Sequence, residues 1–481
     1  MTMGFASRII IGPLLLTLLG IAPAGLDARL AALAAESHHA AREHFIAQRT
    51  QTYERRTYTD RVETQGMRRI SHRCQHAICH GSYFDGTRTF SLSYNDAAFP
   101  ESDADNGTTR TIRAIDSLAF AEPVFARTGG VVTDEPARGD SLVRYRITAP
   151  AGRALIAAFD SATGRLAHID DGERVIISYH DYRDVEGTWF AFARTSGGET
   201  VSYDRVTRTN APLEGPHGLG IEATDDAALA LQGNGPTPTF RCQLASIEFT
   251  CLLDTGTVGM AIGLRAAERL HLEPEGEIDV AGLGRYVSGL VHTGPLVLPG
   301  ARIHDARFLV LPDFRAADII VGGDALLSLR ASIDYAHRTI GFSSAEKPAA
   351  NTLAIAFRDF RPYVDIELAG ERAALELDTG DDSAIDLGYA YFRTRPDLFT
   401  VETRGRTEGI GASTDRFGGT LRGVGVGPFR FESVATVVTR TLRERGHLGA
   451  KLLERFTVTL DFAHERVELA PRQDLVGLPI R

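Results

Sequence analysis

Hydrophobic and polar residues alternate along much of the first half of the chain. The alternation is clearest in four segments rich in Thr, Tyr, Val and Ile, namely TRTFSLSYN, SLVRYRIT, RVIISYHDY and TWFAFARTS. Successive side chains of a strand point to opposite faces, so a period of two predicts half-buried antiparallel strands. We therefore expect a first β-sheet domain over residues 43–207. The next residues, 208–238, are rich in Gly, Pro and Asn, and we expect a linker there.

The second half of the chain repeats itself. It is β-rich from Thr239 onward, and the polar segment SSAEKPAANT at 343–352 divides it in two. Four short sequences recur in one order, with an offset of about 125 residues. The pairs are Asp-Thr-Gly at 254–256 and 378–380, Gly-x-Gly at 282–284 and 409–411, IIVGGDALLS and GHLGAKLLE, and IDYAHRTI and LDFAHERV. Four matches in register indicate an internal duplication, with units at 239–342 and 353–470.

Each Asp-Thr-Gly stands where an apolar strand ends, after FTCLL in one unit and AALEL in the other. Glycine allows a tight turn, and a threonine hydroxyl can bond to nearby backbone, so the carboxylate is held in position. Two equivalent units packed about a pseudo-twofold axis would bring Asp254 and Asp378 face to face. Carboxylates that close share one proton, which leaves one as a base for water and the other as an acid.

The repeated motifs resemble those of bacterial retropepsin-like aspartic peptidases, from about Thr239 to Leu469. The resemblance implies a mainly β fold in which two retropepsin-like closed β-barrel lobes lie in tandem as a pseudo-dimer. It makes Asp254 and Asp378 catalytic, and the residues that would support their loops are Thr255, Gly256, Thr257, Thr379 and Gly380. It also implies flaps that close over the substrate, at Gly282, Leu283, Gly284, Gly409, Ile410 and Gly411.

The second unit departs from the family pattern at two positions. The residue after Asp-Thr-Gly is usually Ala, Ser or Thr; Thr257 fits this pattern, whereas Asp381 does not. His447 stands in the apolar-apolar-Gly element beneath the loop, where the family has an apolar residue. An extra carboxylate beside the dyad would raise its pKa values or abolish its activity. A working peptidase and an inactive relative that keeps the cleft both stay open.

Four cysteines form two local pairs, Cys74/Cys79 and Cys242/Cys251, which predict two disulfides in an exported protein. The first pair lies in SHRCQHAICHG, whose histidines and cysteines also suit a zinc site. A c-type haem site would need Cys-x-x-Cys-His, and here four residues separate the two cysteines. We expect a small disulfide loop with solvated histidines.

The N-terminus has the features of an export signal. Arg8 precedes the apolar run IIIGPLLLTLLGI, and Ala22-Pro23-Ala24 offers a small-x-small cleavage pattern, so residues 1–24 are expected to be a signal peptide. Cleavage after Ala32-Leu33-Ala34 and an uncleaved membrane anchor are the alternatives. We expect an exported protein, periplasmic or secreted. The formal net charge of −10 excludes a basic field that would recruit nucleic acid.

The segment TGRLAHIDDGERVIISYHDYRDVEGTWFAF resembles the half-barrel sheets of periplasmic lipoprotein-carrier-like proteins. This resemblance implies a curved antiparallel sheet that holds a lipid or another hydrophobic ligand. A spacer, or a pro-region that covers the cleft, stays open as an alternative. The function expected for the chain is that of an exported aspartic endopeptidase, without metal or cofactor, acting on peptide or protein as a monomer. The alternative is a catalytically inactive protein that binds peptide or lipid.

Overall fold

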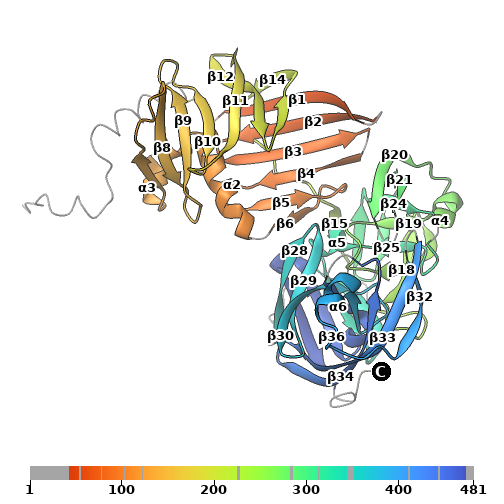
Figure 1. The fold of residues 1–481 in the computed structure, drawn as a ribbon. Coiled ribbons are helices and arrows are strands. Elements are labelled where there is room, and N and C mark those ends of the chain that lie inside the picture. The colour runs from red at the N-terminus through yellow and green to blue at the C-terminus, as the bar shows by residue number, and fades with distance from the viewer. Residues whose placement is uncertain are drawn as a thin grey trace, which may run out of the picture.

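The computed structural model describes residues 43–53, 56–76, 78–101, 103–121, 123–224, 228–281, 285–312, 314–343, 351–409, 412–442 and 445–472. Over these residues the protein is mainly β, as the alternating pattern predicts, with four sheets and a few short helices (Figure 1). The predicted signal peptide, 1–24, lies outside the described residues. None of the helices within the described ranges is both long and apolar enough to span a membrane.

Two antiparallel sheets build the first part of the chain, in the orders β14-β1-β2-β3-β4-β5-β6 and β13-β12-β11-β10-β9-β8-β7. The strands of the first sheet are β1 (His44–Tyr53), β2 (Arg56–Gln65), β3 (Arg68–Gln75), β4 (Ile78–Phe84), β5 (Thr89–Leu92), β6 (Ala98–Pro100) and β14 (Arg205–Thr209). Those of the second are β7 (Val131–Asp134), β8 (Leu142–Thr148), β9 (Leu155–Asp160), β10 (Leu166–Asp170), β11 (Val175–Val185), β12 (Thr188–Ser196) and β13 (Glu199–Ser202).

Helix α2 (Asp103–Asp116) covers the inner face of the second sheet. Its buried Ile115 packs in one cluster with Phe159 and Ile169, which the alternation of β9 and β10 turns to the same side. Two short helices follow α2, namely η3 (Ala119–Ala121) and α3 (Pro123–Arg127). The first part of the chain therefore has a core of its own.

Two larger sheets build the second part (Figure 1). The third sheet contains β15 (Gly220–Ala223), β17 (Thr239–Leu244), β18 (Ile247–Leu253), β19 (Ala261–Gly263), β20 (Glu275–Ala281), β21 (Arg285–His292), β22 (Leu296–Leu298), β23 (Ala301–His304), β24 (Arg307–Leu311) and β25 (Ile319–Val321). The fourth contains β16 (Leu229–Ala230), β26 (Arg330–Asp334), β27 (Thr339–Ser343), β28 (Thr352–Arg358), β29 (Arg361–Leu368), β30 (Glu371–Asp378), β31 (Ile385–Gly388), β32 (Thr403–Gly409), β33 (Ala412–Val426), β34 (Phe429–Thr439), β35 (Gly446–Gly449), β36 (Phe456–Asp461) and β37 (Arg466–Pro471). The helices are α4 (Leu264–Arg269), α5 (Gly323–Leu326), α6 (Tyr389–Thr394), α7 (Ala450–Leu453) and η4 (Phe462–His464).

The segment expected to be a linker, 208–238, contributes edge strands to both of these sheets. β15 pairs with β23 in the third sheet, and β16 pairs with β27 in the fourth. The Gly- and Pro-rich residues around these two short strands carry the chain from the first part to the second.

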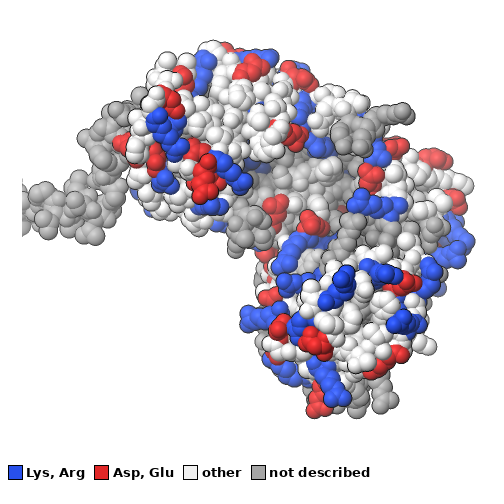
Figure 2. Space-filling model, in the orientation of Figure 1, with Lys and Arg blue, Asp and Glu red and all other residues white. Residues whose placement is uncertain are grey.

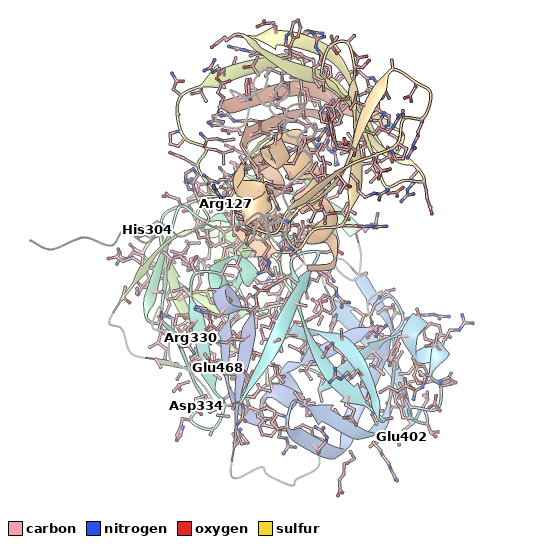
Figure 3. All side chains as sticks on the ribbon, turned by 90° about the vertical axis from the view of Figure 1, so that its left-hand side faces the viewer. Arg127, His304, Arg330, Asp334, Glu402 and Glu468 are labelled. Atoms are coloured by element: carbon pink, nitrogen blue, oxygen red, sulfur yellow. A yellow bond between two sulfur atoms is a disulfide. The ribbon has the colours of Figure 1, made fainter. Side chains whose placement is uncertain are left out.

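The two repeated units meet in the fourth sheet, where β26 of the first pairs antiparallel with β36 of the second. Ser332 lies opposite Thr459 in this pairing. At one end of β26, Arg330 donates a hydrogen bond of 2.8 Å to Glu468 of β37 (Figure 3). One apolar core runs through both units, from Phe240 to Leu469.

The first part of the chain packs against both units. Phe99 of β6 makes edge contacts with the rings of Phe357 and Phe360, with centroids 5.6 and 5.4 Å apart. Arg56 at the start of β2 forms an ion pair with Asp279 of β20 at 2.8 Å. Acidic and basic side chains are intermixed over the visible face of both parts (Figure 2). Apolar packing and scattered ion pairs therefore hold the parts together.

Candidate active site

The two Asp-Thr-Gly loops leave corresponding strands of the two repeated units. β18 ends one residue before Asp254, and β30 ends on Asp378. Each strand has a parallel neighbour, β25 in one unit and β35 in the other. Leu253 and Leu377, which precede the aspartates, are fully buried. Buried apolar strands thus fix the point at which each loop begins.

The threonines of the two loops bind each other's backbone. The Thr255 N–H donates to Thr379 Oγ1 at 3.1 Å, and the Thr379 N–H donates to Thr255 Oγ1 at 3.0 Å. The Thr379 hydroxyl donates to the Leu253 carbonyl at 2.7 Å, and the Thr255 hydroxyl donates to the Leu377 carbonyl. Both threonines are almost completely buried. Four bonds, in two reciprocal pairs, therefore hold the loops together.

The glycines of the loops bring the two aspartates against each other. A Cβ atom at Gly256 would lie 2.7 Å from Asp378 Cγ, and one at Gly380 would lie 2.5 Å from Asp254 Cγ. Real Cβ atoms do not approach other atoms so closely, so any residue but glycine at either position would displace the opposite carboxylate. Each carboxylate therefore lies against the glycine of the opposite loop. The structure brings Asp254 and Asp378 together, as the sequence predicted.

Asp254 is held by its own loop. The Gly256 N–H donates to Asp254 Oδ1 at 2.9 Å, and the Thr257 hydroxyl donates to Asp254 Oδ2 at 2.8 Å. Burial and the charge of Asp378 raise the pKa of Asp254 to about 7, although the hydrogen bond from Thr257 lowers it. Asp254 therefore retains a proton well above the pH at which an exposed aspartate loses its own.

Asp378 has a different second partner. The N–H groups of Gly380 and Asp381 donate to Asp378 Oδ1 at 2.8 and 3.2 Å. His447 Nδ1 lies 3.3 Å from Asp378 Oδ2, the oxygen that corresponds to the one bound by Thr257 in the other loop. Burial raises the pKa of Asp378, the charge of His447 lowers it, and the charges of Asp381 and Glu376 raise it again, to about 6.

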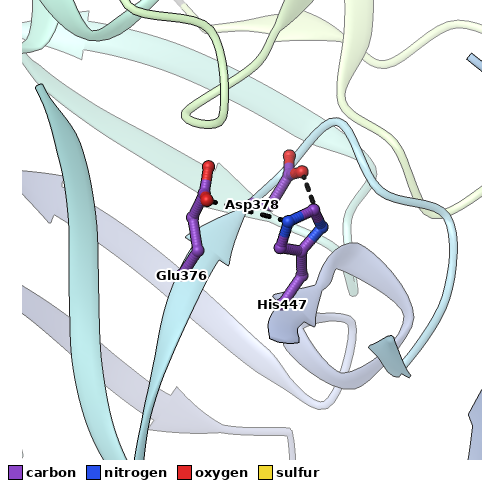
Figure 4. A group of neighbouring side chains, drawn as sticks. All are labelled: Glu376, Asp378 and His447. Carbon is purple, nitrogen blue, oxygen red and sulfur yellow. Dashed lines mark ion pairs between the residues drawn. The ribbon is translucent and has the colours of Figure 1, made fainter. Parts of the chain in front are cut away.

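His447 lies at the centre of a cluster of carboxylates beneath the second loop (Figure 4). Its Nδ1 is 3.3 Å from Asp381 Oδ2 as well as from Asp378, and its Nε2 is 3.7 Å from Glu376. Burial lowers the pKa of His447, but the hydrogen bond to Asp381 and the charges of the three carboxylates raise it to about 10. The same hydrogen bond and charge hold the pKa of Asp381 below its ordinary value, despite burial. His447 is therefore a partly buried cation at neutral pH.

Glu376, Asp378 and His447 also offer three ligand atoms within 4.8 Å of one another. A metal would need the histidine ring to be neutral, with one nitrogen free to coordinate it. Here both ring nitrogens face carboxylate oxygens, which is the arrangement of a doubly protonated ring. The cluster fits a network of ion pairs around the second aspartate better than a metal site.

The residues predicted to form the flaps lie mostly outside the described residues. This is the case for Gly282, Leu283 and Gly284, and for Ile410 and Gly411. Gly409 ends β32, where it is exposed and pairs with Ala412 of β33. The β20–β21 and β32–β33 hairpins are described up to these tips. The flap positions remain predictions.

Both predicted disulfides are confirmed. Cys74 and Cys79 join β3 to β4, with Cα atoms 4.0 Å apart, and Cys242 and Cys251 join β17 to β18, with Cα atoms 5.9 Å apart. The sulfur atoms of SHRCQHAICHG are thus bonded to each other and are not metal or haem ligands. The second disulfide braces the strand that leads to Asp254.

Two acidic side chains near the loops, Glu376 and Asp324, were not predicted from the sequence. Glu376 interrupts an apolar strand two residues before Asp378, and only the register of β30 with β35 shows that it faces His447. Asp324 is buried beneath the first loop, where Asn95 Nδ2 donates to it at 2.8 Å and burial raises its pKa to about 7. The signal in each case was an acidic residue inside an apolar run.

Comparison of the chain with protein-family models gives no match, and comparison with curated proteins gives none either. Function is therefore inferred from the two loops themselves. They bring together two partly buried carboxylates, reciprocal threonines and close-packed glycines.

Proposed function

We propose that the chain is an exported aspartic endopeptidase, which hydrolyses peptide bonds with water activated between Asp254 and Asp378. The observation that carries this proposal is the reciprocal packing of the loops, in which each glycine lies against the other loop's carboxylate. Two aspartates held this way cannot both ionise easily, and their pKa values of about 7 and about 6 suit a pair that shares one proton near neutral pH.

We further propose that residues 239–342 and 353–470 are two retropepsin-like lobes forming a pseudo-dimer, preceded by a curved sheet domain. Supporting this, the pairing of β26 with β36 is symmetric with respect to the repeat. In the sequence repeat, Ala331 corresponds to Val458, and Ile333 corresponds to Leu460. In the sheet, Ala331 lies opposite Leu460, and Ile333 lies opposite Val458. Exchanging the units leaves this register unchanged, which is what a pseudo-twofold axis at Ser332 and Thr459 requires.

The surroundings of the two aspartates give them different roles. The cationic His447 beside Asp378 favours the ionised carboxylate, so Asp378 is the base and Asp254 holds the shared proton. Asp378 takes a proton from water while the water oxygen attacks the peptide carbonyl carbon. Asp254 gives its proton to the carbonyl oxygen. The resulting gem-diol collapses when Asp378 protonates the leaving nitrogen and Asp254 takes back a hydroxyl proton, which restores both groups.

The substrate class that fits is an extended peptide. A peptide bound as a strand would pair its backbone with the β20–β21 and β32–β33 hairpins, while side-chain pockets set the specificity. The ion pair of Arg56 with Asp279 ties the first part of the chain to one of these hairpins. The β20–β21 hairpin is therefore expected to move less on substrate binding than the β32–β33 hairpin.

The test is cleavage of a diverse peptide mixture between about pH 5 and pH 8 by the full chain. Asp254→Asn and Asp378→Asn should each lower the rate by about 10³-fold or more, because each removes one half of the acid–base pair. Thermal unfolding should show both variants folded. Undiminished cleavage by either folded variant would exclude the dyad.

A second candidate function is peptide binding without hydrolysis, and the observation that favours it is the extra charge around Asp378. Under this alternative the folded wild type cleaves no peptide at any pH. Peptides would still bind to the wild type, and binding would survive Asp254→Asn and Asp378→Asn. Titration with the same mixture, analysed by mass spectrometry of the retained peptides, separates the two functions.

A further inference from the structure

A cavity of about 210 Å³ lies in the first part of the chain, lined by residues of its two sheets and of helix α2. Apolar and aromatic side chains form most of its wall, including Phe45, Ile115, Leu118, Phe159, Leu166, Trp189 and Phe190. It is distant in sequence from both Asp-Thr-Gly loops and plays no part in the proposed hydrolysis. Its wall suits an apolar ligand.

Arginines also line this cavity, and they outnumber its acids. Arg69 of β3, Arg113 of α2 and Arg194 of β12 all reach it, whereas Asp116 is the one acidic residue in its wall. Asp116 is already engaged, because it accepts hydrogen bonds from Arg113 at 2.9 Å and from the Tyr179 hydroxyl. The cavity therefore contains more positive charge than its own carboxylate can balance.

Arg69 and Arg194 have no counter-charge of their own. Arg69 is only 9% exposed, and within the described residues neither arginine has a hydrogen-bonding or ion-pair partner for its guanidinium. Burial and the charges of Arg113 and Arg194 lower the pKa of Arg69 to about 9. A buried cation without a partner is costly, so this pair of guanidinium groups is a site prepared for an anion.

The two arginines stand where the apolar cavity meets a polar one. A second cavity, of about 410 Å³, shares Val62, Arg69, Arg194 and Tyr203 with the first. The rest of its wall is mostly polar, with Ser71, His72, Arg73 and His80 among the lining residues. Its acidic residues are Glu199 and Asp60, and Asp60 already accepts hydrogen bonds from Arg49 and Arg73. Alternation along β3 turns Arg69, Ser71 and Arg73 to the same face, which places the arginine at the boundary.

We propose that this site binds an amphiphile, with its carboxylate or phosphate between Arg69 and Arg194 and its apolar tail in the cavity lined by Phe45, Phe159 and Phe190. Guanidinium groups bind either anion through paired charge-assisted hydrogen bonds. The cavity is smaller than the roughly 300–1,000 Å³ of sites for drug-sized ligands, so the tail is a single short chain.

The experiment titrates the full chain with decanoate, decyl phosphate, decanol, decyltrimethylammonium and inorganic phosphate. Trp189 is the only tryptophan in the chain and lines the cavity, so its fluorescence reports binding directly. Decanoate, decyl phosphate or both should bind saturably, and whichever is tighter identifies the headgroup. Decanol, decyltrimethylammonium and inorganic phosphate should each bind at least about tenfold more weakly.

The variants Arg69→Met and Arg194→Met should each weaken binding of the anionic ligand about tenfold or more, while Arg174→Met, at an exposed position of the same domain, should not. Arg69→Lys should recover part of the affinity. Arg69→Met should unfold at no lower temperature than the wild type, because it removes an unpaired buried charge. Equal binding of decanol and decanoate, equal binding of inorganic and decyl phosphate, no binding of either anionic amphiphile, or full affinity in the two methionine variants would overturn the proposal.

Discussion

Asp254 and Asp378 leave strands of the same kind, yet their surroundings differ in charge. Beneath Asp254, the buried Leu252 lies opposite the buried Ile320 in the register of β18 with β25. The corresponding pair beneath Asp378 is Glu376 opposite His447, in the register of β30 with β35. An apolar support in the first unit is thus replaced by an ionic one in the second.

The residue after each Asp-Thr-Gly changes together with this support. In the first loop, the Thr257 hydroxyl binds Asp254 Oδ2. In the second, Asp381 has no hydroxyl to offer, and His447 approaches the matching oxygen instead while it also binds Asp381. The changes at Asp381 and His447, relative to the first unit, therefore compensate each other. The difference shows how a duplicated unit can keep one geometry and still give its two acids different proton affinities.

The largest expected effect comes from the feature that the loops share. Gly256→Ala or Gly380→Ala would place a Cβ atom under 3 Å from the opposite carboxylate, so one aspartate must move. We expect kcat/KM to fall about 100-fold or more, because displacements of this size misalign acid and base. Gly294→Ala is the control, since nothing lies within 4 Å of its Cβ. Equal loss in both glycine variants supports the symmetry, and full activity in either contradicts the packing.

Substitutions of the two loop threonines should have the next largest effect. Thr255→Val and Thr379→Val each remove a hydroxyl that donates to one buried group and accepts from another across the loops. Each should lower the free energy of unfolding by about 2 kcal/mol, measured by urea denaturation, and by similar amounts in the two loops. Serine at either position should retain most of the stability. A valine variant with the same free energy of unfolding as the wild type would show that the reciprocal bonds do not hold the loops together.

His447→Gln tests the difference between the loops. Activity requires ionised Asp378, so it is present above the pKa of this group and is lost as the pH falls through it. Removing the cation raises that pKa, so the acid limb should move upward and kcat/KM at pH 6 should fall roughly tenfold. His337→Gln, at an exposed turn, should change nothing. An unmoved acid limb would exclude a role for His447 in the dyad.

A triple variant, Glu376→Leu, Asp381→Thr and His447→Ile, gives the second loop the apolar surroundings of the first. It serves as a second test in case His447→Gln fails to fold. It replaces the ionic cluster with the counterparts of Leu252, Thr257 and Ile320. We expect it to fold and to retain cleavage, because the first loop is stable with these residues. A folded but inactive triple variant would show that the ionic cluster is required for hydrolysis.

The smallest effect concerns Asp324, whose counterpart in the repeat is the exposed Lys451. Its folded-state pKa is raised to about 7, so ionisation favours the unfolded chain increasingly as the pH rises from about 4 to 7. Between pH 5 and pH 8 the free energy of unfolding, measured by urea denaturation, should fall in the wild type. In Asp324→Asn it should fall by roughly 1 to 2 kcal/mol less over the same range. Lys451→Asn should follow the wild type. Parallel curves for Asp324→Asn and the wild type would place Asp324 in contact with solvent.

Much of this arrangement could be predicted from the sequence. Alternation gave the β-rich fold, local spacing gave both disulfides, and the repeat paired Asp254 with Asp378. The contact of Glu376 with His447 could not be predicted, because it depends on the register of two strands about 70 residues apart. The burial of Asp324 was hidden for a similar reason, since Asn95 comes from a distant part of the chain.

The measurement that tests the central claim most directly is the pH dependence of kcat/KM for a cleaved peptide, from about pH 4 to about pH 9. A dyad that shares one proton predicts a bell-shaped profile, with limbs near the pKa values of about 6 for Asp378 and about 7 for Asp254. Activity should fall below the first limb, where both groups are protonated, and above the second, where both are ionised. A rate that rises steadily to pH 9, or folded protein that cleaves nothing, would contradict it.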